Sequence, residues 1–154
     1  MMNDCCSNHK EMKTENDVGN CISCNRKGKK VKLITLKSLL RPSALELLDA
    51  NVNHYFCSTK DCNVVYFDTN NKNYLLSDVK VPVHQKDDSS ITPICYCFDW
   101  TKERIKEYVE DGLTPNPVDH IRDNIKENRC GCEVNNPQGS CCLGNVTAYI
   151  RELS

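Results

Sequence analysis

Cysteine is the residue type that could carry chemistry in this chain of 154 residues, which contains twelve of them. The cysteines fall into close sets along the sequence: Cys5-Cys6, Cys21-x2-Cys24, Cys57-x4-Cys62, Cys95-x-Cys97, Cys130-x-Cys132 and Cys141-Cys142. Thiolates one to four residues apart can converge on one metal ion from a single turn, whereas disulfide partners usually lie further apart. In a reducing compartment, closely spaced cysteines are more often metal ligands or redox groups than disulfides. We therefore favour metal binding over a secreted disulfide scaffold.

Two of the sets predict a zinc site. Cys21 and Cys24 form one knuckle, and Cys57 and Cys62 form a second one after a stretch long enough for a β-rich lobe. Four thiolates suit tetrahedral, redox-inert Zn2+, and an ion held by two separated knuckles can cross-link a lobe with a small core. Basic residues beside the knuckles, Arg26, Lys27, Lys29, Lys30 and Lys60, are expected to offset the negative charge of the thiolates.

The later sets predict an iron-sulfur site. A [2Fe-2S] cluster needs four thiolates, which a Cys-x-Cys pair and a later pair in a helix-flanked loop can supply. Spacing alone does not settle which two of Cys130, Cys132, Cys141 and Cys142 bind iron. We favour Cys132 and Cys142, together with Cys95 and Cys97. Cys142 lies nearest the start of the helix that carries Val146, so the positive end of that helix would stabilise an anionic cluster. Cys130 and Cys141 are then expected to be thiols without a metal, a redox pair or inert buried thiols.

The spacing also supports a resemblance to a known family. The segment from Cys95-Tyr-Cys97-Phe to Cys142-Leu-Gly-Asn-Val resembles the bacterioferritin-associated ferredoxin-like [2Fe-2S] domain. The arrangement from Cys21 onward, about four fifths of the chain, resembles the amino-terminal zinc and [2Fe-2S] domain of CopZ-type copper chaperones. This resemblance implies one zinc, one [2Fe-2S] cluster, and electrons supplied to reduce Cu(II) for delivery as Cu(I). Chaperone members add a heavy-metal-associated domain with a Met-x-Cys-x-x-Cys loop, which is not found before Ser154, so a separate copper chaperone or transport ATPase is expected as a partner.

The predicted fold class is α+β, with a small zinc-stapled β-rich lobe followed by a small helical [2Fe-2S]-binding lobe. Residues 1–18 are expected to be a disordered leader, 19–85 the zinc-binding domain, and 92–154 the cluster-binding domain. In the first domain we expect a β-rich stretch over Val31–Leu36, a short helix over Ser43–Ala50, and a hairpin of His54–Cys57 with Val64–Phe67. A last strand near Val79–Val83 leads into a polar linker within residues 77–92.

In the second domain, capping residues predict the helices. Thr101 is a candidate N-cap for a helix that carries Ile105, Tyr108 and Val109. Asn116-Pro117 opens a second helix with Val118, Ile121 and Ile125, and a third runs from about Cys142 to Leu153.

Composition narrows the function classes. The net charge is −1, from 20 basic and 21 acidic residues, which gives no long-range attraction to nucleic acid or to an anionic membrane. The polar amino terminus and the absence of a long apolar run predict a cytoplasmic protein without membrane insertion. The leader's Cys5, Cys6 and His9 could form a soft-metal site, although incidental cysteines in a disordered segment are favoured.

The sequence therefore predicts an electron carrier rather than a conventional enzyme, transferring one electron at a time in copper or metal homeostasis. Copper and an electron donor protein are the expected partners. The alternatives are a zinc-ribbon adaptor, or an iron-sulfur sensor or scaffold without electron-transfer turnover. A zinc-only nucleic-acid module is disfavoured by the net charge.

Overall fold

The computed structural model describes residues 19–154. The predicted leader over residues 1–18, with Cys5, Cys6 and His9, lies outside the described residues. The described chain is a mixture of short helices and small antiparallel sheets, as the α+β prediction requires. Its buried apolar residues form clusters within residues 21–83 and another within residues 94–146. We refer to residues 19–83 as the amino-terminal half and to residues 93–154 as the carboxy-terminal half.

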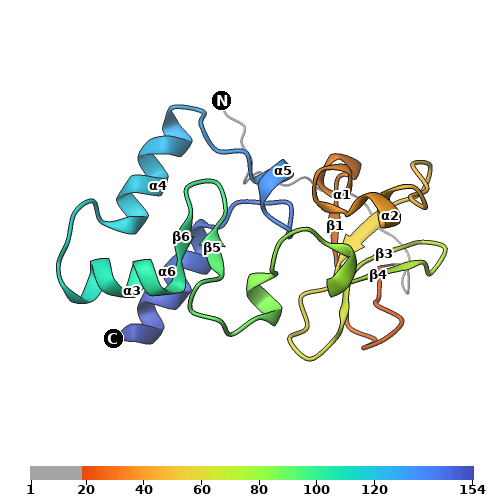
Figure 1. The fold of residues 1–154 in the computed structure, drawn as a ribbon, viewed down its shortest axis with the longest axis horizontal. Coiled ribbons are helices and arrows are strands. Elements are labelled where there is room, and N and C mark those ends of the chain that lie inside the picture. Colours follow the sequence, from red (N-terminus) through yellow and green to blue (C-terminus); the bar gives the residue numbers. More distant parts are fainter. Residues whose placement is uncertain (1–18) are drawn as a thin grey trace.

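A four-stranded antiparallel sheet forms the amino-terminal half (Figure 1). Its strands pair in sequence order: β1 (Lys29–Val31), β2 (His54–Phe56), β3 (Val64–Asp68) and β4 (Asn73–Leu75). The predicted hairpin of β2 and β3 is confirmed, with Tyr55 opposite Phe67 and their rings stacked at 5.4 Å. Every residue of β3 is buried, because apolar clusters cover both faces of this strand.

The predicted β-rich stretch over Val31–Leu36 is wrong beyond Val31. Strand β1 ends there, and helix α1 spans Leu33–Leu39. Leu36, Leu39 and Leu40 enter the core together, which a helical spacing of three and four residues permits. The predicted helix over Ser43–Ala50 is shorter, because α2 spans only Pro42–Leu45.

The predicted strand near Val79–Val83 is also wrong. This segment contributes one isolated bridge, between Leu40 and Val79. It is flanked by two 3-10 turns, η1 (Leu76–Asp78) and η2 (His84–Lys86). Val79 and Val83 are nevertheless buried in the sheet's core, so their side chains pack without the backbone extending the sheet.

Three helices and a hairpin make up most of the carboxy-terminal half. The hairpin pairs β5 (Pro93–Cys95) with β6 (Trp100–Thr101), and the helices are α3 (Lys102–Glu110), α4 (Pro117–Lys126) and α6 (Leu143–Leu153). Both predicted caps are confirmed: Thr101 accepts from Arg104 N, and Asn116 accepts from Val118 N and Asp119 N. Ile105, Ile121 and Val146 bring the three helices onto one apolar core with Trp100.

The short helix α5 (Cys132–Asn135) was not predicted, and it lies where the two halves meet. It packs against α1 of the amino-terminal half (Figure 1). After α5, the Tyr66 hydroxyl on β3 donates a buried hydrogen bond of 2.5 Å to Pro137 O. Gly139 has φ +73°, and a side chain there would meet Val31 and Thr35 at 3.2 and 3.1 Å. The loop that carries Cys132, Cys141 and Cys142 therefore rests directly on the amino-terminal half.

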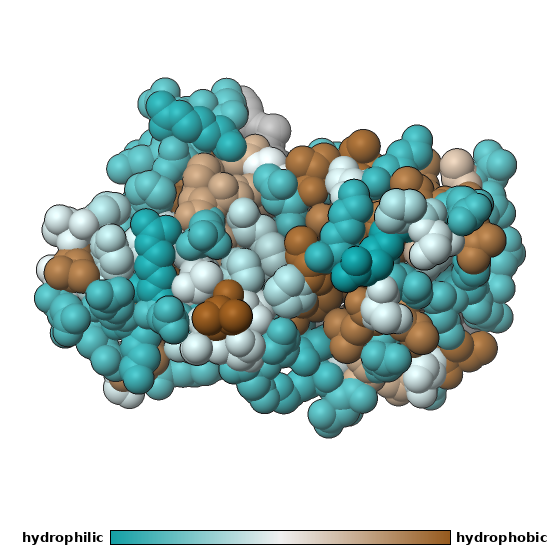
Figure 2. Space-filling model, in the orientation of Figure 1, coloured by the Kyte–Doolittle hydropathy of each residue, from teal (hydrophilic) through white to brown (hydrophobic). Residues whose placement is uncertain are grey.

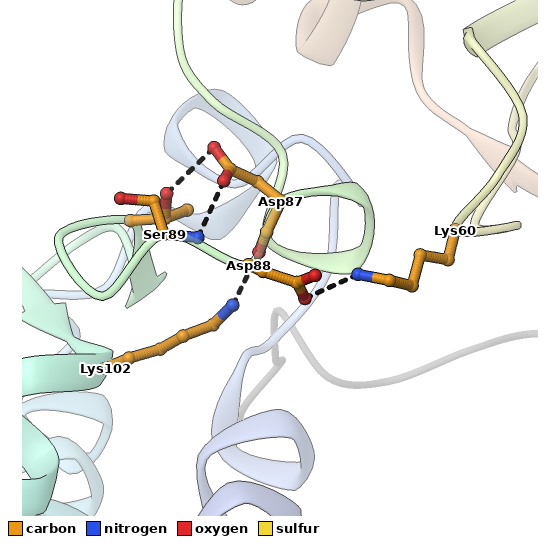
Figure 3. Close-up of polar contacts among 6 residues, drawn as sticks. Lys60, Asp87, Asp88, Ser89 and Lys102 are labelled. Carbon is orange, nitrogen blue, oxygen red and sulfur yellow. Dashed lines mark hydrogen bonds and ion pairs between the residues drawn. The ribbon is translucent and has the colours of Figure 1, made fainter.

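The segment between the halves is held from both sides. Lys60 forms an ion pair of 2.5 Å with Asp88, and Lys102 Nζ donates to Asp87 O at 2.6 Å (Figure 3). Asp87 also accepts from the Ser89 backbone N–H at 2.8 Å. The predicted polar linker is consequently a structured connection with contacts to both halves.

Most of the face in Figure 2 is hydrophilic, with apolar residues gathered toward the half that carries the sheet. Among residues 19–154, no helix is both long and apolar enough to cross a membrane.

Candidate metal centres

The four cysteines predicted to bind zinc converge in the structure. Their Sγ atoms all lie within 4.8 Å of one another, with Cys21 and Cys62 3.8 Å apart and Cys24 and Cys57 3.7 Å apart. Cys21, Cys57 and Cys62 are buried and Cys24 is half-buried. None of these thiols is in a disulfide.

Local turns present the first pair of thiols. Cys21 N donates to Arg26 O at 2.8 Å, and Asn25 N donates to Cys21 O at 2.6 Å. Asn25 closes this turn with φ 62°, in the left-handed region that asparagine tolerates better than most residues. Gly28 follows, and a Cβ there would approach Phe67 to 2.6 Å, so the turn can lie close against the sheet only with glycine.

The hairpin presents the second pair. Cys57 directly follows β2, and its N–H donates to Val65 O at 2.8 Å. Cys62 lies two residues before β3, and its N–H donates to Thr59 O at 3.2 Å. Both thiols are thus fixed by the backbone of the same hairpin.

Burial and hydrogen bonding act in opposite directions on these thiols. Burial raises the pKa of Cys21 to about 12 and also raises the pKa of Cys57. Burial opposes ionisation of Cys24 as well, but Thr59 Oγ1, 3.3 Å from its Sγ, and backbone contacts outweigh it and lower its pKa to about 6. Cys24 therefore ionises more readily than Cys21 or Cys57.

One cation that contacts this set was not identified from the sequence. Lys86 Nζ lies 3.7 Å from Cys57 Sγ and acts to lower the pKa of that thiol. Lys60, which was expected in that role, pairs with Asp88 instead. Lys86 lies 24 residues beyond Cys62, so spacing around the knuckles could not identify it.

The donor set fits Zn2+. Four thiols at mutual distances below 4.8 Å form one compact group, and four soft sulfur ligands in a closed site are typical of structural zinc. The two knuckles come from separate parts of the chain, so an ion held there would join the turn after Gly19 to the β2–β3 hairpin.

The second predicted set also comes together, from β5 and the loop around α5. Cys97 Sγ lies 3.7 Å from Cys132 Sγ, although 35 residues separate them. Contact with Cys132 lowers the pKa of Cys97 to about 6, assisted by the Gly131 N–H at 3.1 Å. Asn135 Nδ2 adds a third contact with Cys97 Sγ, at 3.6 Å. Gly131 and Asn135 were not identified from the sequence.

Cys142 joins the remaining members of this set. It is buried beside Cys95 and Cys132, and contact with them lowers the pKa of Cys142 to about 4. The same contact raises the pKa of Cys95. Cys142 is also the N-cap residue of α6, which confirms its predicted place at the start of that helix.

The second set is more open than the first. Among the described residues, only the first set is a group of metal-ligating atoms that all lie within 4.8 Å of one another. A [2Fe-2S] cluster would need four thiolates shared by two irons, and this set offers four neighbouring thiols for such a centre. Cys141 lies close enough to Cys132 to raise the pKa of that thiol, and Cys130 is half-buried.

Aromatic packing closes one side of this second set. Trp100, on β6, is fully buried, and its Nε1 donates to His120 Nδ1 at 3.1 Å. The Arg104 guanidinium stacks 3.8 Å above the Trp100 ring and donates to Phe98 O. These contacts hold the Cys97–Trp100 turn against the helical core, which also includes Cys95 and Cys142.

Comparison with known proteins points to one family for the first set. Residues 18–80 match the family model zf_CopZ, described as a zinc binding domain. This segment is therefore similar to the zinc binding domain that the family model describes. The matched residues contain all four cysteines of the compact set, so the family match and the geometry agree on Zn2+.

Two further similarities extend past that segment. The chain is 28% identical over 122 residues to the copper chaperone CopZ of Archaeoglobus fulgidus, covering 79% of this chain and 57% of that protein. The chain therefore spans less than two thirds of the length of this curated relative. The crystal structure of the CopZ amino-terminal domain of A. fulgidus matches with a TM-score of 0.69 and 24% identity, over 84% of this chain and 95% of that one. This likeness shows a shared fold.

Proposed function

We propose that the protein is a zinc and [2Fe-2S] protein that transfers one electron at a time in copper homeostasis, with Cu(II) reduced to Cu(I). Zinc would be held by Cys21, Cys24, Cys57 and Cys62, and the cluster by Cys95, Cys97, Cys132 and Cys142. The observation that carries the proposal is the convergence of two separate sets of four thiols. The similarity to CopZ directs the chemistry toward copper.

The two sites would have different roles, one structural and one in electron transfer. Zinc has no accessible redox change, so the first site stabilises the fold. A bound [2Fe-2S] cluster would supply one-electron chemistry at the second site. There, the Gly131 N–H and the Asn135 amide donate toward Cys97 Sγ, and such donors stabilise negative charge on a ligand sulfur.

The partners follow from this chemistry. An electron donor protein would reduce the second site, and Cu(II) would take up one electron. A separate copper chaperone or transport ATPase would receive Cu(I). We place the protein in the cytoplasm, where thiol ligands stay reduced, without nucleic acid or membrane insertion in its function.

Copper reduction tests the proposal. The protein is reduced chemically under anaerobic conditions, separated from excess reductant, and mixed with Cu(II) and a chelator that traps Cu(I). We expect the reduced protein to form about one more Cu(I) per chain than the oxidised protein, because a [2Fe-2S] centre carries one electron. The visible spectrum should return to that of the oxidised cluster as Cu(I) forms. Cys97→Ser should give slower reduction.

Other thiols can also reduce copper, so a matched control is required. A variant lacking residues 1–10 removes Cys5 and Cys6 and should retain the spectrally coupled Cu(I) formation. If Cu(II) is reduced equally well without the visible chromophore, electron transfer is wrong and an adaptor or iron-sulfur sensor role replaces it.

A further inference from the structure

The turn η2, His84–Lys86, contacts the surroundings of both thiol sites. Its last residue reaches the first site: Lys86 Nζ donates to Thr59 O at 2.6 Å and to Cys62 O at 2.9 Å. The same ammonium lies 3.7 Å from Cys57 Sγ. One side chain from outside the hairpin therefore ties together both ends of the Cys57–Cys62 knuckle.

The middle residue of η2 reaches the loop of the second site. Gln85 Nε2 donates to Gln138 Oε1 at 2.6 Å. Gln138 Nε2 in turn donates to Cys141 O at 2.9 Å, and Asn145 Nδ2 donates to the same Gln138 oxygen at 2.8 Å. Through Gln138, η2 thus fixes the backbone immediately before Cys142.

The first residue of η2 reaches the other ligand segment of the second site. His84 N donates to the Tyr96 hydroxyl at 2.9 Å, and that hydroxyl donates to Pro82 O at 2.7 Å. Tyr96 lies between Cys95 and Cys97. Three consecutive residues in one tight turn therefore contact one knuckle of the first site and both ligand segments of the second.

We propose that η2 is a bridge that couples the two metal centres, with Lys86 as a positioning residue, so that zinc in the first site tightens the hold of the second site on its cluster. Zinc orders the Cys57–Cys62 knuckle and with it the two carbonyls that Lys86 binds. Lys86 shares one 3-10 turn with Gln85 and His84, so a shift of its backbone also moves theirs. This inference rests on the cofactors of the proposed function. Because coupling free energies are reciprocal, the cluster must tighten zinc binding by the same factor, which for coupled sites is typically about 5- to 150-fold.

The variant Lys86→Met tests the bridge, because it keeps the aliphatic stem and removes the donors. Its matched control is Lys60→Met, which removes a contact between the same knuckle and the same connecting segment. The Lys60–Asp88 pair is exposed at both ends, 53% and 85%, so its loss should have little effect (Figure 3). Lys86→Arg restores N–H donors and should restore most of the native behaviour.

The primary readout is the rate at which an iron chelator bleaches the visible spectrum of each zinc-loaded protein. We expect Lys86→Met, with its zinc still bound, to lose its chromophore about fivefold faster than the native protein, because a weaker hold on a ligand shows mainly in its dissociation rate. Lys60→Met should match the native rate. Removing zinc from the native protein should accelerate bleaching by a similar factor. Removing zinc from Lys86→Met should accelerate its bleaching by a smaller factor. A native bleaching rate that does not depend on zinc would overturn the bridge, and so would equal rates in Lys86→Met and Lys60→Met.

A second readout separates this inference from the proposed function. Hydrogen exchange over residues 130–142 is compared between zinc-loaded and zinc-stripped native protein, without any cluster. Zinc should slow exchange in this segment, and this effect should be smaller in Lys86→Met. If no chromophore forms in any protein, the cluster assignment fails, yet zinc-dependent exchange that is smaller in Lys86→Met would still support the bridge. Exchange that is insensitive to zinc would overturn the bridge whatever the second site binds.

Discussion

The hydroxyl of Tyr66 provides a direct test of how the sheet holds the loop of the second site. Tyr66 lies on β3 and is fully buried, and its hydroxyl donates at 2.5 Å to Pro137 O, five residues before Cys142. The substitution Tyr66→Phe keeps the ring and removes only this donor. A buried carbonyl would then lack its partner.

The expected size of the effect follows from that loss. Leaving a buried acceptor unsatisfied costs about 1–3 kcal/mol, so the free energy of unfolding should fall by about 2 kcal/mol. The matched control lies opposite on the neighbouring strand. Tyr74 is the register partner of Tyr66, and its buried hydroxyl has no hydrogen-bond partner among residues 19–154. Tyr74→Phe should therefore be neutral or slightly stabilising.

Urea unfolding of the zinc-loaded, reduced proteins measures both variants. With a slope of about 2 kcal/mol per molar urea, a loss of about 2 kcal/mol moves the midpoint down by roughly 1 M. Hydrogen exchange should show the loosening over residues 132–142. Equal midpoints for Tyr66→Phe and Tyr74→Phe would refute the argument that this hydrogen bond anchors the loop.

Three further predictions address the metal sites and the helices. Cys57→Ser should reduce the zinc content from about one per chain to near zero, because a structural site needs its full ligand set. A native zinc content in elemental analysis would contradict the assignment of Cys57 as a zinc ligand. Cys97→Ser should bleach or shift the visible spectrum, because a hard oxygen replaces a soft sulfur on iron, whereas Cys130→Ser should retain it; the reverse pattern in absorption spectra would mean that the ligands are wrongly assigned. Thr101→Ala should lower the free energy of unfolding by about 1 kcal/mol through loss of the N-cap of α3, and an unchanged thermal midpoint would argue against that cap.

Local signals in the sequence predicted the parts of the fold that depend on local chemistry. Thr101 and Asn116 were recognised as N-caps because their side chains satisfy backbone N–H groups within three residues. The hairpin of β2 and β3 followed from β-branched and aromatic residues on both sides of a cysteine turn. The compact zinc set followed from knuckle spacing, since both pairs lie in tight turns.

Segments governed by distant contacts were predicted less well. β-Branched residues near Ile34 suggested a strand, but burial of Leu36 and Leu39 against the sheet favours the helix α1. Tertiary packing outweighs such local preferences. Residues 77–92 have the composition of a linker, and only contacts across the fold, such as Lys86 with the knuckle, show that they connect the two sites.

Metal analysis of the protein purified anaerobically from iron-replete cells tests the central claim most directly. The account predicts a red-brown protein with about one zinc, two iron and two sulfide per chain, because one compact and one more open set of four thiols are present. A colourless protein that contains zinc but neither iron nor sulfide would contradict it.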